Sequence, residues 1–234
     1  MTQTLDWIEN AVQKRSPFCR HTVVNAAKIV LAQRDPLLKQ SIRESDLINI
    51  DGQPVVWAAR LLGIPVPEKV SGSDLIVALL KSAEQKGWRV FFLGGTRNVL
   101  EQMSRRLQQR HPGLILAGKR DGYFPEEEAA SVASQIRESK ADILFVGMPT
   151  PKKEIFLSRF REVMQVPFSM GVGGSFDILA GKTKRAPRWL QQTGLEWFFR
   201  MAQEPRRLFK RYWQTNRRFV YMVFKEYLHQ KRKK

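Results

Sequence analysis

Short apolar runs alternate with amphipathic stretches along the middle of the chain. The run WRVFFLGG at 88–95 is apolar and ends in glycines, which is typical of a buried strand. Residues 96–113 then carry Val99, Met103 and Leu107 at helical spacing until a Pro-Gly pair ends the pattern. The same contrast predicts strands at 21–25, 45–50, 114–124, 141–149 and 166–174, and helices at 26–33, 51–63, 125–140 and 150–165.

This rhythm of strand, helix and strand predicts right-handed β-α-β units and therefore an α/β fold with a parallel sheet. From Ala186 onward the pattern is helical and aromatic, and it contains no further strand. We therefore expect an α/β body at 1–185 and a helical appendage at 186–234.

Charge separates these two parts more sharply than hydrophobicity does. The chain of 234 residues has a formal net charge of +18, and the segment from Lys182 onward holds 16 Lys and Arg against 3 Asp and Glu. A segment with this excess attracts polyanions, such as nucleic acid, anionic lipid or a diphosphate.

A helical wheel of the tail separates its aromatic residues from its cations. Nine apolar or aromatic residues occupy about half of the wheel: Leu208, Phe209, Tyr212, Trp213, Phe219, Val220, Val223, Phe224 and Tyr227. Six cations occupy the other side: Arg207, Lys210, Arg211, Arg217, Arg218 and Lys225. The pattern predicts a basic amphipathic helix, or two with a break near Thr215–Asn216. It favours a membrane surface, and an ordinary helix packed on the body is the alternative.

Candidate chemistry lies where the predicted strands end, because ligands of open α/β sheets bind at the carboxyl ends of the strands. Asp51 directly follows the apolar LINI run and can serve as a general base or as a helix cap. Asp177 can bind a sugar hydroxyl or cap a helix. Asn25, Gly52, Gly94, Tyr123, Gly147, Pro149, Gly173 and Gly174 occupy or border other strand ends.

Several classes of site are disfavoured by the sequence. The glycines match neither the dinucleotide fingerprint nor the P-loop, and the three histidines show no metal-ligand spacing. The single cysteine, Cys19, cannot form an intrachain disulfide. No run of 18 apolar residues and no signal peptide are visible, so we expect neither a membrane span nor secretion.

An ordered set of motifs resembles the WecG/TagA/CpsF family, glycosyltransferase family 26. The motifs run from about residue 21 to residue 212, and they are VVNAAKI, DLINIDGQPVV, EKVSGSDL, VFFLGG, DGYF, VGMPTPKKEIF, MGVGGSFDILAGKTKRAP and GLEWFFRMAQEPRR. The resemblance implies a Rossmann-like core with a C-terminal appendage. It also implies inverting, metal-independent transfer from a UDP-sugar to an undecaprenyl-diphosphate-linked saccharide in bacterial surface polysaccharide synthesis.

The resemblance also assigns roles to residues. Asp51 matches the family's catalytic base, Asn25 its pocket motif, and Tyr123 and Asp177 positions near UDP. Arg200, Arg207 and Lys210 fall in the appendage that faces the acceptor diphosphate. We count Lys69, Lys153, Glu154 and Arg185 among the substrate-binding candidates, with Trp213, Phe224, Arg211, Arg217 and Arg218 as membrane contacts.

Two positions depart from the family pattern. Val23 stands where teichoic-type members have threonine, and Lys153 stands where the family commonly has a pocket glutamine. The hypothesis at Lys153 is that its cation pairs with a carboxylate or a phosphate of the donor.

These observations predict a cytoplasmic enzyme at the inner face of the cytoplasmic membrane, with no cofactor. Its expected partners are a UDP-sugar, the polyprenyl-linked acceptor, the membrane surface and further copies of the chain, but not nucleic acid. The donor sugar expected is N-acetylmannosamine, N-acetylmannosaminuronic acid or glucose. The alternative hypotheses are a basic nucleic-acid-binding α/β protein and a nicotinamide-dependent oxidoreductase.

Overall fold

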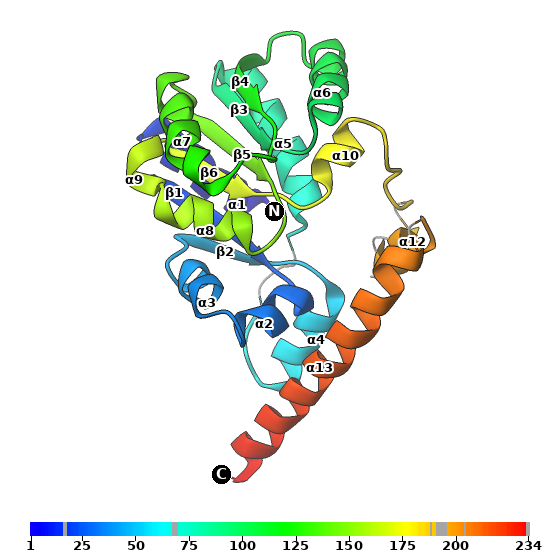
Figure 1. Cartoon of the computed structure of the whole chain (residues 1–234). Helices are drawn as coiled ribbons and strands as arrows, with labels where there is room; N and C mark the ends of the chain where they lie inside the picture. The colour runs from blue at the N-terminus through cyan, green and yellow to red at the C-terminus, as the bar shows by residue number, and fades with distance from the viewer. Residues whose placement is uncertain (16–17, 67–69, 188, 191–195, 204, 233–234) are drawn as a thin grey trace.

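The computed structural model describes residues 1–15, 18–66, 70–187, 189–190, 196–203 and 205–232. Six parallel strands form one sheet in the order β2-β1-β6-β5-β3-β4 (Figure 1). The strands are β1 Cys19–Val24, β2 Leu47–Ile50, β3 Arg89–Gly94, β4 Ile115–Arg120, β5 Ile143–Gly147 and β6 Phe168–Gly171. The α/β class and the six strands predicted from the apolar runs are confirmed.

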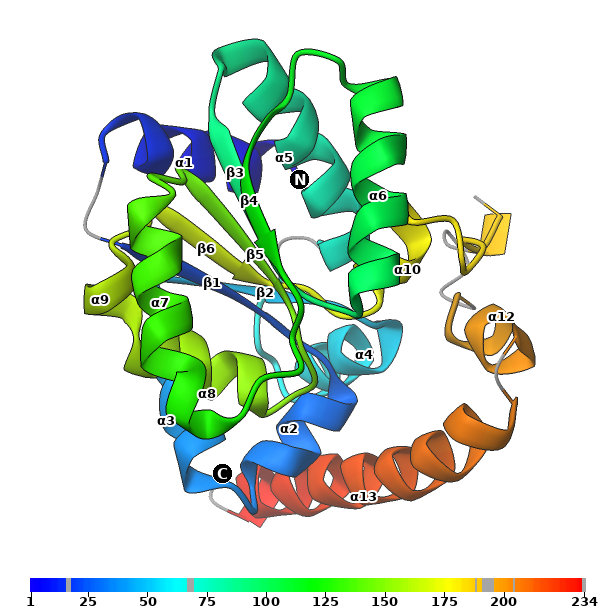
Figure 2. The same ribbon diagram turned by 45° about the horizontal axis from the view of Figure 1, so that its top comes forward.

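Helices cover both faces of the sheet (Figure 2). Those before β4 are α1 Thr2–Gln13, α2 Ala26–Ala32, α3 Pro36–Arg43, α4 Gln53–Leu61, α5 Gly72–Lys86 and α6 Arg97–Arg110. After β4 come the 3₁₀ turn η1 Glu126–Glu128, α7 Ala129–Glu138, α8 Lys152–Arg159, α9 Arg161–Met164, α10 Ser175–Leu179, α12 Glu196–Gln203 and α13 Pro205–Arg232. The helical period therefore appears between successive strands, as the sequence pattern indicates.

The hydrophobic core has two layers because alternate strand residues face opposite sides of the sheet. Phe92, Phe145 and Phe168 pack with α1, α5, α6 and α10 on one face. Leu93 and Val146 pack with α7, α8 and α9 on the other. Strands buried on both faces are continuous apolar runs, which explains why β3 and β5 were visible in the sequence.

The appendage is attached to the body by contacts from α12 and α13. Helix α13 lies along α2, and Phe219 is buried in one apolar cluster with Ala26, Val30, Val55 and Ala58 of α2 and α4. Gln203 of α12 exchanges two hydrogen bonds with the backbone of Lys184. The helix runs from Pro205 to Arg232 without the break considered near Thr215–Asn216, because Thr215 and Asn216 are both helical.

A buried histidine near the start of β1 gives the fold a pH dependence. His21 is 1% exposed and its Nε2 lies 2.7 Å from Oδ1 of Asn49 on β2. Burial is the main cause that lowers the pKa of His21 to about 4, although the Asn49 contact opposes this. The folded state therefore favours the neutral imidazole. The contribution of His21 to the stability of the fold is fully present above the unfolded pKa of about 6.5.

We expect the free energy of unfolding to fall by about 3 kcal/mol as the pH falls from 6.5 to 4. In this range His21 binds a proton in the unfolded chain but stays neutral in the folded protein. Urea denaturation at several pH values measures this slope. A His21→Gln variant retains a polar group beside Asn49 but does not titrate, so its stability should vary much less between pH 6.5 and 4.5. Equal slopes for the two proteins would contradict the assignment.

Candidate active site

The carboxyl ends of all six strands lie at one edge of the sheet, because all of the strands are parallel. Val24 pairs with Ile50 at the ends of β1 and β2, and the N–H of Asp51 donates to the carbonyl of Val24 over 2.9 Å. Asn25 and Asp51 therefore lie side by side although 25 residues separate them in sequence. The structure thus brings together a carboxylate and an amide at the edge where α/β sheets bind ligands.

Both of these residues lead directly into helices. Oδ1 of Asn25 accepts a hydrogen bond from the N–H of Lys28 over 2.9 Å, so Asn25 caps α2. Gly52 precedes α4 with a φ of +98°, a conformation that side chains rarely adopt. The glycine therefore lets the chain turn sharply from Asp51 into α4.

The glycines of β3 and β5 serve the packing of the sheet at this edge. A Cβ on Gly94 would lie 2.5 Å from the carbonyl carbon of Gly147, and one on Gly147 would lie 2.6 Å from the ring of Phe176. Gly94 pairs with Gly147 across the two strands. Close packing is therefore sufficient to explain both glycines, and their predicted contact with substrate stays a prediction.

The end of β6 is more open. A Cβ on Gly173 would meet no atom within 4 Å, and Gly174 precedes α10, which contains Asp177. Tyr123, after β4, is 77% exposed, and Pro149, after β5, is also exposed. Gly173, Tyr123 and Pro149 are therefore all exposed at these strand ends.

A buried ionic cluster joins α2 to α8 beneath this edge. Nζ of Lys28 lies 2.8 Å and Nζ of Lys153 lies 3.2 Å from Oε1 of Glu154. Lys28 also donates to Oγ1 of Thr22, and Lys153 to Oγ1 of Thr150. Two lysines and one glutamate leave a formal charge of +1 among residues that are at most 6% exposed.

The charges and the burial of this cluster shift the pKa of both Lys153 and Glu154. Burial lowers the pKa of Lys153, although the charge of Glu154 opposes that effect. Burial by itself raises the pKa of Glu154, but the charges of Lys28 and Lys153 outweigh it and the pKa is lowered. Glu154 is therefore held as a carboxylate by two cations, while its Oε2 is buried without a described protein partner.

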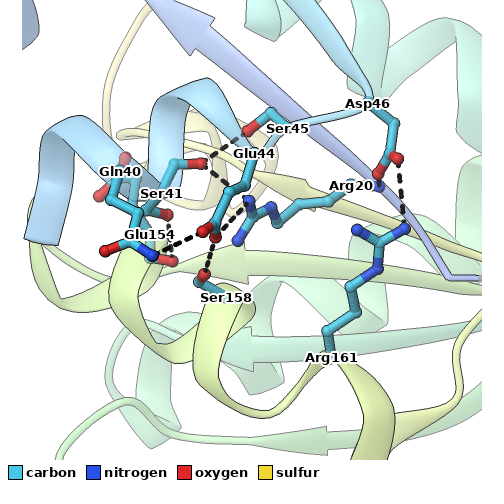
Figure 3. A network of polar contacts seen from close by, with 9 residues as sticks. All are labelled: Arg20, Gln40, Ser41, Glu44, Ser45, Asp46, Glu154, Ser158 and Arg161. Atoms are coloured by element: carbon cyan, nitrogen blue, oxygen red, sulfur yellow. Dashed lines mark hydrogen bonds and ion pairs between the residues drawn. The ribbon is translucent and has the colours of Figure 1, made fainter.

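Helix α3 fixes the backbone that carries Glu154 (Figure 3). Oγ of Ser41 donates to the carbonyl of Glu154 over 2.7 Å, and the carbonyl of Ser41 accepts from Nη2 of the buried Arg20 over 2.8 Å. Ser158, one turn further along α8, donates to Glu44 over 3.0 Å. These contacts hold the first turn of α8 in place against α3.

Lys153 differs from the sequence expectation in its surroundings. It was proposed as a cation available to the donor, but it is 6% exposed and paired with Glu154. Its side chain packs against Gly171, where a Cβ would lie 3.1 Å from Cδ of the lysine. Any contact with substrate therefore involves the whole cluster rather than Lys153 alone.

Lys28 is a member of this cluster that sequence reasoning did not select. The available signal was a lone charged residue in the otherwise apolar helix AAKIVLA. Charged side chains are almost never fully buried unless they are paired, so such a residue predicts a buried partner. The sequence could not identify Glu154 as that partner, because the two residues are 126 positions apart in the chain.

Other candidate residues have different environments. Arg185 forms an ion pair with Asp74 in the first turn of α5, so its charge is already partnered. Lys69 lies outside the described residues. For Arg200, Arg207, Lys210 and Arg211 the structure describes the helix backbone but not the side chains. Their predicted contacts with the acceptor or the membrane therefore stay predictions.

The apolar half of α13 divides into two stripes. Phe219 is buried against α2 and α4, and Met222 and Val223 pack beside it. A second set on the same helix is exposed, with exposed fractions between 57% and 65%: Phe209, Trp213, Val220 and Phe224. Arg217 and Arg218 are exposed as well. One stripe therefore holds the helix on the body, and the other remains at the surface.

The described residues show neither a cluster of metal ligands nor a membrane-spanning helix. They contain no group of three or more His, Cys, Asp or Glu side chains arranged to hold a metal ion. None of the described helices combines the length and hydropathy needed to span a bilayer.

Two comparisons connect this arrangement to known proteins. The model of the glycosyl transferase WecG/TagA/CpsF family matches residues 1–233. The chain is also 35% identical over 176 residues to an N-acetylglucosaminyldiphosphoundecaprenol N-acetyl-beta-D-mannosaminyltransferase of Bacillus spizizenii. That match covers 75% of this chain and 68% of the relative.

Proposed function

The chain belongs to the WecG/TagA/CpsF family of glycosyltransferases, and from this premise we propose that it transfers N-acetylmannosamine from UDP to an undecaprenyl-diphosphate-linked saccharide. The family match over residues 1–233 carries the proposal. The activity for which the Bacillus spizizenii relative is named supports this choice of sugar and acceptor. The product serves the synthesis of a bacterial surface polysaccharide.

The position of Asp51 supports a single-displacement mechanism. The Asp51 carboxylate takes the proton from the acceptor hydroxyl as that oxygen attacks the anomeric carbon. The bond between this carbon and the UDP oxygen breaks, and UDP leaves with the electron pair. A single displacement of this kind inverts the configuration at the anomeric carbon.

The charge that develops on UDP needs positive partners, which a metal-independent enzyme takes from its own chain. The backbone N–H groups near Gly173 and the basic appendage are the proposed source. Asn25, Tyr123 and Asp177 complete the proposed donor site at the strand ends.

Membrane docking forms part of this proposal, because the acceptor is anchored in lipid. Residues 205–232 contain nine Lys and Arg against one Glu, and the exposed stripe of α13 includes Trp213 and Phe224. Aromatic residues beside cations suit the headgroup layer of an anionic membrane. We place the protein at the inner face of the cytoplasmic membrane on this basis.

A panel of donors tests the proposed reaction. UDP-N-acetylmannosamine, UDP-N-acetylmannosaminuronic acid and UDP-glucose are each incubated with a short-chain polyprenyl-diphosphate-linked N-acetylglucosamine, and mass spectrometry follows the product. We expect a mass increase of one N-acetylhexosamine with the first donor, and no loss of activity when EDTA is added. Transfer from another donor would correct the sugar, and no transfer from any would contradict the function.

The family match replaces the two alternative hypotheses, an oxidoreductase and a nucleic-acid-binding protein. Membership of a glycosyltransferase family accounts for the α/β core without a nicotinamide cofactor. It also gives the basic tail an anionic partner other than nucleic acid, namely the acceptor diphosphate and the lipid around it.

A further inference from the structure

Helix α4 carries an exposed apolar stripe on the side that faces away from the core. Trp57 is 60% and Leu61 is 52% exposed, and their spacing of four residues places them on one helical face. Ile64, which is 51% exposed, follows the end of the helix. Val55 and Ala58, on another face of α4, are buried in the cluster that contains Phe219. We call Trp57, Leu61 and Ile64 the α4 stripe.

The α4 stripe is held in a fixed position. The N–H of Ile64 donates to the carbonyl of Ala59 over 2.8 Å, and Gly63 makes the turn between them with a φ of +69°. This contact ties Ile64 to the end of the helix. The three apolar side chains are therefore presented together rather than on a loose loop.

The charges around the α4 stripe favour an anionic partner. Arg60 is exposed between Trp57 and Leu61, and no Asp or Glu occurs in residues 52–67. The exposed cations Arg217 and Lys225 lie on α13, which shares a buried cluster with α2 and α4. Within residues 205–232 of α13, Glu226 is the one acidic residue.

The place of α4 in the fold connects this surface to the active site. Asp51 directly follows β2, Gly52 makes the turn, and α4 begins at Gln53. Trp57 is four residues into the helix, so about 6 Å of helical rise separates it from the start of α4 at Gln53. In both views α2 and α4 lie between the sheet and α13 (Figures 1 and 2).

We propose that the α4 stripe docks into the headgroup layer of an anionic membrane beside α13 and so holds Asp51 at the level of the lipid-linked acceptor. This inference rests on the proposed function, because α13 supplies the neighbouring membrane contact. Interfacial helices insert their apolar face about 5–10 Å into that layer. An acceptor diphosphate at this depth meets the strand ends without leaving the membrane.

Sedimentation with vesicles of phosphatidylglycerol and phosphatidylcholine tests the proposal. We expect the Trp57→Ser/Leu61→Ser variant to bind at least about tenfold more weakly than the unmodified protein, because two large apolar side chains lose their burial in lipid. The control is Trp7→Ser/Ile115→Ser, which removes a Trp and an aliphatic residue of 39% and 40% exposure from α1 and β4. It should bind unchanged, and so should the apolar variant Trp57→Phe/Leu61→Met.

Activity provides a second readout. Transfer to an acceptor embedded in vesicles should fall in the Trp57→Ser/Leu61→Ser variant, while transfer to a water-soluble short-chain acceptor should stay within about twofold. Loss of both activities would overturn the inference, because it would place the stripe in the folding or chemistry of the enzyme.

A variant of α13, Trp213→Ser/Phe224→Ser, separates the inference from the proposed function. Loss of vesicle binding in this variant alone overturns the role of α4 and leaves membrane docking by α13 intact. Unchanged binding in both variants overturns both. Analytical ultracentrifugation tests whether the α4 stripe binds a second copy of the chain instead of a membrane. A dimer that dissociates in the Trp57→Ser/Leu61→Ser variant would show this and would overturn the inference.

Discussion

Replacing Asp51 with asparagine is expected to lower the rate of sugar transfer by about 10²–10⁴-fold, because the amide cannot accept the proton of the acceptor hydroxyl. The two side chains have nearly the same shape, so the turn into α4 should persist. The N–H of residue 51 still donates to the carbonyl of Val24, since that contact uses only the backbone. The loss should therefore appear in kcat and leave binding of UDP nearly unchanged.

The measurement compares turnover of the two proteins under saturating donor and acceptor. Isothermal titration with UDP serves as the control for an intact donor site, and circular dichroism serves as the control for the fold. Turnover within threefold of the unmodified enzyme in Asp51→Asn would show that another group accepts the proton.

The second large effect is expected on stability. Glu154→Gln should lower the free energy of unfolding by about 3–5 kcal/mol, because it leaves Lys28 and Lys153 buried without a counter-charge. Both lysines are 6% exposed, so water does not replace the lost carboxylate. Urea denaturation at pH 7 measures this difference.

Two single variants serve as controls for Glu154→Gln. Lys153→Gln retains the ion pair between Lys28 and Glu154 and should cost less than Glu154→Gln. Glu44→Gln removes an exposed carboxylate from the same region and should change stability much less than Glu154→Gln does. Equal stability of Glu154→Gln and the unmodified protein would show that the cluster does not need its negative charge.

Lys153→Gln also tests the hypothesis about donor choice. If the cluster supplies a positive charge to the donor, this variant should alter the rate or the preference among the three UDP-sugars. Unchanged rate and preference would assign Lys153 to the support of α8 alone.

The order of elements along the chain was predictable because it depends on local periodicity. Strands β3 and β5 are buried on both faces, so their residues form continuous apolar runs. The helix α13 was predictable from its wheel. Helix α5 was not predicted, although Leu75, Leu79 and Ala83 recur at helical spacing and are fully buried.

The candidate site was predictable only in part. Strand ends were the expected location, and Asp51 and Asn25 are there. Their position side by side depends on β1 and β2 being neighbours, which the sequence pattern does not reveal. The stabilising role of Glu154 was also hidden, because burial in the fold couples it to lysines on two different helices.

By itself the sequence determined the alternation of strands and helices, the positions of strand-end residues and the separation of charge between body and tail, because each depends on residues close together in the chain. The tertiary structure decided the strand order that places Asp51 beside Asn25. It also decided which charges are buried together and which half of the α13 apolar face remains exposed. These features arise from contacts between distant segments, and only packing removes water from some side chains and leaves others at the surface.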